Sequence, residues 1–264
     1  MRDLQVGCTL EFDVARPAEI VLQLAVARRP GVTVDDRLDA WLDDRPVPVV
    51  ALDTPDGGRV HLFTAAPGRL RIAYDARAAV EASPAAVTPL ERIAALQPSR
   101  YCPSDRLLGF AERQFGQIDD PAAVAAFVHD RTRYVAGAST VTTDATDTLL
   151  SGEGVCRDYA HLVCALCRAL GIPARLAAVY APGLSPMDFH AVAEVAVGGV
   201  WQIVDATRLA PRTSLIRIAT GPDAAATAFA TVQSGAADLV ALNVRAIVDG
   251  DLPADDHTGP ATLA

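Results

Sequence analysis

One short stretch, residues 151–173, limits the possible folds of this chain more than any other. It opens with a glycine-bracketed loop at residues 152–154, and Cys156 follows almost at once. From there apolar residues recur at the three- and four-residue spacing of one helix face. The intervening positions are mostly Ala, Cys and Leu, so the helix is predicted to be buried on nearly all sides. Gly171 fits a left-handed cap at its end, and Pro173 prevents continuation.

Cys156 is therefore predicted at the N-terminus of a buried helix. Free backbone N–H groups and the helix dipole favour an anion at that position, so a thiolate is stabilised there. A cysteine nucleophile suits this place, although a lone buried cysteine is more often a packing residue. A catalytic role needs a base and a group that orients the base elsewhere in the sequence.

A predicted hairpin supplies both groups. Residues 190–197 and 200–205 read as strands, and Gly198-Gly199 between them is a two-residue turn signal. Counting back from this turn puts His190 and Asp205 on one face as diagonal neighbours, with backbones about 7–8 Å apart. A hydrogen bond between imidazole and carboxylate would orient the ring, and its other nitrogen can then face a thiol.

These motifs resemble those of the bacterial transglutaminase-like superfamily. The resemblance covers residues 99–235 and lies in Gly-Val-Cys-Arg-Asp-Tyr-Ala-His-Leu, Leu-Gly-Ile-Pro-Ala-Arg, Asp-Phe-His-Ala and Trp-Gln-Ile-Val-Asp-Ala-Thr-Arg. It implies a papain-like core with a Cys-His-Asp triad: Cys156 is the nucleophile, His190 the general base and Asp205 the residue that orients it. Ala191 and Ala206 depart from the family pattern, which has an aromatic residue and a proline near these places.

Two domains are predicted, because 264 residues exceed what one compact core usually holds. Residues 1–80 alternate between apolar and polar and contain turn signals, which predicts an antiparallel β-sandwich-like domain. Residues 81–98 read as a linker and first helix, 99–250 as the transglutaminase-like catalytic domain, and 251–264 as a disordered tail. The predicted fold class is α+β, with a papain-like (transglutaminase core) catalytic domain.

Local patterns add detail to this division. The stretch 134–148 is rich in Thr, Ala and Asp and reads as a loop before the Cys156 helix. Alternating apolar residues or capping signals predict strands at 3–14, 18–27 and 239–248 and helices at 89–97, 105–115 and 121–131.

Charge and cysteine usage exclude several function classes. The net charge of −9 argues against a nucleic acid as partner, because no basic stripe offsets it. No apolar run approaches the roughly 18 residues that a membrane span needs, and residues 1–16 do not resemble a signal peptide. Five cysteines without a regular framework indicate free thiols in a reducing cytoplasm.

The other reactive side chains favour structural roles. Cys164 and Cys167 form a C-x-x-C in mid-helix, where core packing is expected rather than a metal or redox site. His161 is expected to make a structural hydrogen bond, Asp158 to interact with the helix dipole, and His129 to lie on the surface. No four-ligand cluster is recognisable, so activity is expected without a metal or cofactor.

The expected chemistry is thiol-dependent acyl transfer or hydrolysis at an amide, either a peptide bond or a Gln carboxamide. Substrates would be proteins, peptides or small amides, and the thioester intermediate would pass to water or to an amine. The Cys156 N–H would supply one oxyanion-hole donor, and the sequence leaves the second unassigned. Two alternatives stay open: arylamine N-acetyltransferase-like transfer from acetyl-coenzyme A, and a non-enzymatic binding protein on the same fold.

Overall fold

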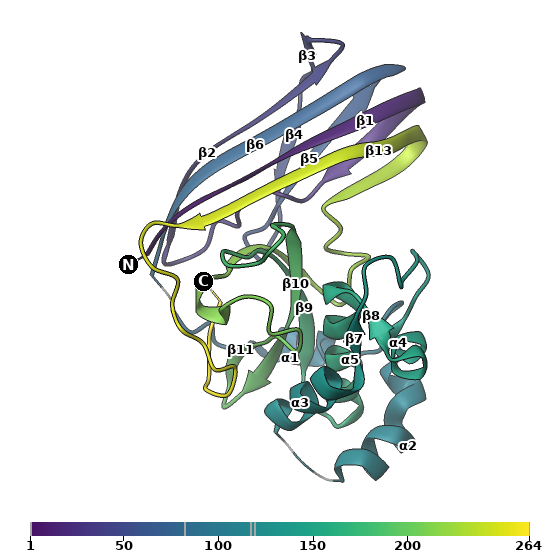
Figure 1. Cartoon of the computed structure of the whole chain (residues 1–264), viewed down its shortest axis with the longest axis vertical. Coiled ribbons are helices and arrows are strands. Elements are labelled where there is room, and N and C mark those ends of the chain that lie inside the picture. The colour runs from purple at the N-terminus through teal and green to yellow at the C-terminus, as the bar shows by residue number, and fades with distance from the viewer. Residues whose placement is uncertain (1, 82, 117, 119, 264) are drawn as a thin grey trace.

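An antiparallel sheet of seven strands curls over the rest of the molecule (Figure 1). The computed structural model describes residues 2–81, 83–116, 118 and 120–263; Met1, Ala82, Gln117, Asp119 and Ala264, which fall in the predicted segments, lie outside the described residues. The strands run in the order β3-β2-β6-β1-β5-β4, with β13 also paired to β1. Their bounds are β1 (Arg2–Leu22), β2 (Val32–Leu42), β3 (Arg45–Pro46), β4 (Val50–Asp53), β5 (Arg59–Ala65), β6 (Gly68–Val80) and β13 (Ala230–Val248).

Strand β1 joins what the sequence predicts as two strands, 3–14 and 18–27. Its first part pairs with β6 as far as Val14, and its second part pairs with β5 from Ala18 onward. The ladder to β13 shifts register on both sides of Arg16. Pro17 lies between the two parts and has no N–H to donate to a ladder. The chain therefore changes partner there without ending its strand.

Strand β13 changes the expected domain boundary. The sequence assigns the closing strand to the catalytic segment 99–250, but the structure pairs β13 with β1, from Leu4 opposite Val248 to Leu22 opposite Ala230. An alternating pattern specifies which side chains are buried and does not specify the partner strand, so the sequence could not reveal this pairing. The last strand of the chain thus completes the sheet of the first 80 residues.

The second unit places a buried helix against a four-stranded antiparallel sheet ordered β11-β10-β9-β12. No helix in the described part of the chain combines the length and apolar character needed to cross a bilayer. Helices α2, α3 and α4 pack on the buried helix α5 (Figure 1). The bounds are α1 (Pro89–Ala94), α2 (Ser104–Phe115), α3 (Pro121–Arg131), α4 (Ala145–Ser151), α5 (Cys156–Ala169), β9 (Ala174–Tyr180), β10 (Phe189–Val197), β11 (Val200–Val204) and β12 (Ile216–Gly221).

Helix α4 occupies a segment that the sequence predicts as loop. Its β-branched and acidic residues are weak helix formers, which hides it from a propensity argument. Its N-terminus is nevertheless well capped, because Asp144 Oδ1 accepts hydrogen bonds from the backbone N–H groups of Thr146 (2.7 Å) and Asp147 (3.0 Å). The Asp147 carboxylate in turn accepts a hydrogen bond from the Asp144 N–H, which completes a capping box.

One apolar cluster spans the two units, and the second unit also has its own cluster around α5. Tyr180 of β9 and Ile216 and Ile218 of β12 belong to the same buried cluster as the apolar residues of β1 and β6. The Tyr180 hydroxyl also donates a hydrogen bond to the Leu24 carbonyl oxygen at 2.8 Å. The curled sheet therefore packs directly against β9 and β12 of the second unit.

The exposed connection after β6 leads to a prediction about proteolysis. Residues 83–85 follow the last long strand pairing of β6, and Ser83 and Pro84 are exposed. Limited proteolysis should therefore cut between about 81 and 100 first. Because β13 and the shared apolar cluster connect the two units, we expect two bands on a denaturing gel but one peak in native size exclusion. Early cuts spread through 151–205 would contradict the two-unit organisation.

Candidate active site

The start of α5 presents Cys156 as the first residue of the helix, as the sequence predicts. The carboxylate of Asp158 is fully buried and accepts a hydrogen bond from the Val155 N–H at 2.8 Å, so it caps the helix from within. Gly154 allows this, because a Cβ there would lie 2.7 Å from the Asp158 Cβ. Cys156 is partly exposed, in contrast to Cys8, Cys102, Cys164 and Cys167, which are buried.

The hairpin of β10 and β11 has the predicted register. Gly198 and Gly199 have φ values of 58° and 81°, the left-handed values of a type I′ turn, and Val197 lies opposite Val200. The prediction that His190 and Asp205 are diagonal neighbours is confirmed, because His190 Nε2 lies 2.9 Å from Asp205 Oδ2.

Both carboxylate oxygens of Asp205 have hydrogen-bond partners. Oδ2 faces His190, while Oδ1 accepts hydrogen bonds from the Thr207 N–H (2.9 Å) and the Thr207 hydroxyl (2.7 Å). Burial alone would raise the pKa of Asp205, but the charge of His190 and the hydrogen bonds hold it below its ordinary value. The group beside His190 is therefore a carboxylate near neutral pH.

His190 lies between this carboxylate and Cys156. Burial would lower the pKa of His190, but Asp205 and the Cys156 side chain raise it to about 10. Nδ1 is buried and has no hydrogen-bond partner among the residues that the structure describes. The structure thus brings all three predicted residues together, with Nε2 on Asp205 and Nδ1 free of any competing bond.

Cys156 and His190 line a cavity of about 580 Å³ between the two units. One wall comes from β13, through Ala230, Thr231 and Leu242, and from Gln23 directly after β1, and much of the rest is apolar. Besides His190, the charged side chains in its wall are Arg100, Arg157 and Asp188. A cavity with mostly apolar walls and a few polar groups is typical of a binding site.

His161 and His129 lie outside this cluster and bond to the backbone. His161 is buried, its Nε2 accepts a hydrogen bond from the Ala224 N–H at 3.1 Å, and its ring stacks on Tyr101. Burial lowers the pKa of His161 to about 3, so it stays neutral, and its predicted structural role is confirmed. His129 does not lie simply on the surface as expected: it is half-buried, with Nδ1 2.9 Å from the carbonyl oxygen of Ala206, beside Asp205.

Tyr134 is a site residue that sequence reasoning missed. It belongs to β7 (Arg133–Tyr134), a two-residue strand in the segment predicted as loop, which pairs in parallel with β8 (Glu153–Gly154). Tyr134 lies beside the start of α5, because it pairs with Gly154 and its ring packs on Tyr159, with centroids 6.1 Å apart. The only signal in the sequence is a β-prone Thr-Arg-Tyr-Val stretch directly after α3.

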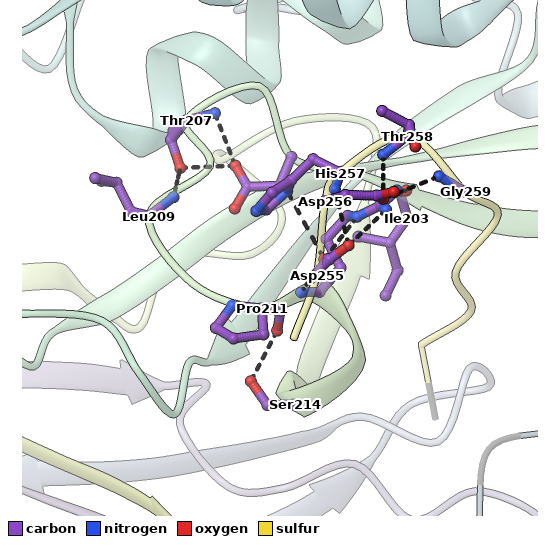
Figure 2. Close-up of polar contacts among 12 residues, drawn as sticks. Ile203, Thr207, Leu209, Pro211, Ser214, Asp255, Asp256, His257, Thr258 and Gly259 are labelled. Carbon is purple, nitrogen blue, oxygen red and sulfur yellow. Dashed lines mark hydrogen bonds and ion pairs between the residues drawn. The ribbon is translucent and has the colours of Figure 1, made fainter. Parts of the chain in front are cut away.

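Polar contacts fasten the C-terminal tail to the rest of the protein, so the expectation of a disordered tail is wrong for residues 251–263; Figure 2 shows the tail residues Asp255 to Gly259. Asp255 accepts hydrogen bonds from the Arg212 backbone N–H (2.7 Å), Nε (2.9 Å) and Nη2 (2.8 Å). The N–H of Ile203 donates to the Ala261 carbonyl oxygen at 2.8 Å, and Leu263 is buried. The tail is held by the Arg212–Asp255 ion pair and by a backbone hydrogen bond to β11. Neither contact produces a periodic pattern of apolar residues, so the sequence did not predict an ordered tail.

We expect Asp255→Ala to lower the free energy of unfolding by about 3 kcal/mol, because Arg212 would be left buried without its carboxylate. Urea unfolding followed by circular dichroism measures this. Asp256→Ala is the matched control, since the exposed Asp256 accepts bonds only from the backbone of Thr258 and Gly259 (Figure 2). Overlapping unfolding curves for the two variants would show that the tail is not anchored at Asp255.

Known proteins resemble this chain over most of its length. Residues 109–206 match the model of the transglutaminase-like superfamily. The crystal structure of a "putative cysteine protease" from Cytophaga hutchinsonii is 30% identical, with a TM-score of 0.89, and the match covers 97% of this chain and 95% of that one. The periplasmic domain of TgpA from Pseudomonas aeruginosa, bound to ethylmercury, is 21% identical, with a TM-score of 0.42, over 78% of this chain and 90% of that one.

A curated relative matches over a shorter stretch. An uncharacterized protein of Mycobacterium leprae is 29% identical over 89 residues, which is 32% of this chain and 32% of the relative. The chain therefore matches about a third of that relative's length.

Within the described residues, no three His, Cys, Asp or Glu side chains are grouped as a metal site would require.

Proposed function

This chain belongs to the transglutaminase-like superfamily, and from that membership we propose that it catalyses thiol-dependent acyl transfer or hydrolysis at an amide. The predicted α+β class with a papain-like core is confirmed by the overlap with the Cytophaga hutchinsonii protein. One observation carries the proposal: His190 bonds Asp205 through Nε2, and the Cys156 thiol and the His190 imidazole line one cavity.

In the proposed reaction, the Cys156 thiolate attacks the amide carbonyl carbon and the carbonyl π electrons move to oxygen. The tetrahedral intermediate collapses to a thioester, and the His190 imidazolium gives its proton to the departing nitrogen. Neutral His190 then takes a proton from the water or amine that attacks the thioester. Asp205 orients the ring and stabilises its positive form throughout.

The substrate is proposed to be a protein, a peptide or a small amide, because the cavity combines apolar walls with a few charged side chains. A nucleic acid is not proposed as partner, because the net charge of −9 opposes one. A cytoplasmic location is also proposed, since all five cysteines are free thiols.

Intact-mass spectrometry tests the proposal. The protein is incubated with peptides, Gln-containing peptides, small amides and acetyl-coenzyme A, with and without a primary amine. A thioester on Cys156 that is absent from Cys156→Ala is the expected result. Because the chain contains no lysine, its own side chains offer no ε-amine acceptor, so any amine product identifies the added acceptor.

Each alternative has its own outcome in this assay. Acylation by acetyl-coenzyme A alone would favour the arylamine N-acetyltransferase-like reaction. Absence of any adduct, while a peptide still binds, would favour a binding protein on the same fold.

A further inference from the structure

Two arginines lie over one aromatic ring in the wall of the cavity that holds Cys156. The Cζ atom of Arg100 lies 5.0 Å from the centre of the Tyr101 ring, and that of Arg157 lies 6.0 Å from it. All three residues line the cavity together with Cys156 and His190. Because Arg157 directly follows Cys156 on α5, this pair of cations belongs to the wall beside the thiol.

The Tyr101 ring that supports the two arginines is fixed from several sides. Its backbone N–H donates a hydrogen bond to Asp223 Oδ2 at 2.9 Å, and its hydroxyl donates one to the Val141 carbonyl oxygen at 2.7 Å. The ring also stacks on His161, with centroids 5.2 Å apart and 9° between the planes. A guanidinium that rests on a fixed ring is partly preorganised, and its N–H groups still point outward to a ligand.

The protein itself satisfies the two guanidinium groups to different degrees. Arg157 donates hydrogen bonds to Asp158 Oδ1 at 3.1 Å and to the Thr140 carbonyl oxygen at 2.9 Å. Arg100 is exposed, and within the described residues no hydrogen bond or ion pair engages its guanidinium. Arg100 is therefore the cation of the cavity wall whose donors remain available.

Two nearby carboxylates bond backbone N–H groups and leave Arg100 unpaired. Asp188, in the same cavity wall, accepts a hydrogen bond from the Phe189 N–H at 2.7 Å. Asp223 is buried and uses its two oxygens on the N–H groups of Tyr101 and Ala225. The positive charge of Arg100 thus lacks a direct partner from either of them.

We propose that Arg100, with Arg157 beside it, selects substrates that carry a carboxylate close to the reacting amide. The inference rests on the proposed acyl transfer and names its substrate class, an acidic peptide or amide. A carboxylate accepts two parallel N–H bonds from a guanidinium, and the donors of Arg100 are available for them. The net charge of −9 repels such a substrate at long range, but salt screens that field beyond about 10 Å, so the contact with Arg100 decides recognition.

Pairs of matched peptides test the proposal through a ratio of rates. Each pair differs by Glu against Gln at one position beside the amide, and one further pair differs by a C-terminal acid against a C-terminal amide. Wild-type protein should form the Cys156 thioester about threefold to tenfold faster with the acidic member of at least one pair. The pair that shows this preference distinguishes a side-chain carboxylate from a terminal one.

Arg100→Gln should reduce the ratio to about one, and about 0.5 M NaCl should reduce it in the wild-type protein. A variant that folds poorly slows both members of a pair equally, so the ratio reports recognition alone. Arg113→Gln is the matched control, because Arg113 is an exposed arginine of α2 outside the cavity wall. It should leave the ratio at the wild-type value.

Fluorescence anisotropy of the same peptides, labelled and mixed with Cys156→Ala protein, measures recognition without the reaction. A ratio that Arg100→Gln leaves at the wild-type value, or a wild-type protein without preference in both rate and binding, would overturn the inference and leave the proposed reaction intact. Preferential binding of the acidic peptides, lost in Cys156→Ala/Arg100→Gln, would support the inference even if the wild-type protein formed no thioester. In that case the proposed function itself fails.

Discussion

Asp205→Asn should lower kcat by on the order of 10²–10⁴ while the fold stays intact. The asparagine oxygen can keep both bonds from Thr207, which leaves its NH₂ group facing His190 Nε2. Nε2 must then accept rather than donate, so the ring proton moves to Nδ1, the nitrogen that should receive the proton of the thiol. The variant also loses the carboxylate that does most to raise the pKa of His190, so the imidazolium becomes scarce at neutral pH.

Steady-state kinetics and a thermal melt measure both parts of this expectation. Asp188→Asn is the matched control: Asp188 lines the same cavity and lies two residues from His190, but its carboxylate bonds only the following backbone N–H. It should change kcat far less than Asp205→Asn does. Unchanged turnover for Asp205→Asn, with an unchanged melt, would show that Asp205 is structural.

Iodoacetamide near pH 6 should modify Cys156 before any other cysteine, and His190→Ala should slow that reaction by up to about 300-fold. The pKa of His190 is raised to about 10, so its positive charge is present at pH 6 and persists until the pH passes that value. Free thiols in general have a pKa of about 8.5 and are only about one part in 300 ionised at pH 6, which sets the upper limit of the expected slowing. At pH 9 to 10 free thiols ionise without a neighbouring cation, so the two rates should converge.

Peptide mapping after a timed reaction reads out each cysteine separately. Burial raises the pKa of Cys8 to about 12 and raises that of Cys167 well above its usual value, and both side chains are enclosed, so they serve as internal controls. Earlier labelling of either one, or equal rates for wild-type and His190→Ala protein at pH 6, would mean that the resting protein has no thiolate–imidazolium pair.

The positive charge of His190 also makes the stability of the fold depend on pH, because the pKa of His190 is raised in the folded protein. A histidine whose pKa is higher in the folded than in the unfolded protein stabilises the fold fully below about pH 6.5. That contribution declines as the pH rises and is lost near pH 10. Asp205 titrates in the opposite sense, because its lowered pKa makes its contribution disappear at acid pH.

The hairpin that carries His190 and Asp205 was predictable because its geometry is local. A two-residue turn determines which residues of the two strands face each other, so Gly198-Gly199 was enough to bring His190 and Asp205 together. The helix of Cys156 was predictable for a similar reason: its apolar period and its glycine and proline end signals all lie within residues 151–173.

What the sequence did not reveal depends on contacts between distant residues. Three such contacts are the pairing of β13 with β1, the Arg212–Asp255 ion pair and the position of Tyr134 near the start of α5. In each of them, the local sequence pattern of one segment does not indicate which other segment it will contact. Helix α4 was missed for a different reason, since its capping box outweighs poor intrinsic propensity.

The pairing of β1 with β13 also bears on synthesis. Leu4 meets its partner Val248 only after almost the whole chain has been translated, and such long-range pairing is slow to form. A nascent chain that has reached Phe229 already carries Cys156, His190 and Asp205, but it lacks Ala230, Thr231 and Leu242, which line the cavity around them. During synthesis, Cys156, His190 and Asp205 therefore emerge before the residues of β13 that complete the wall of the cavity around them.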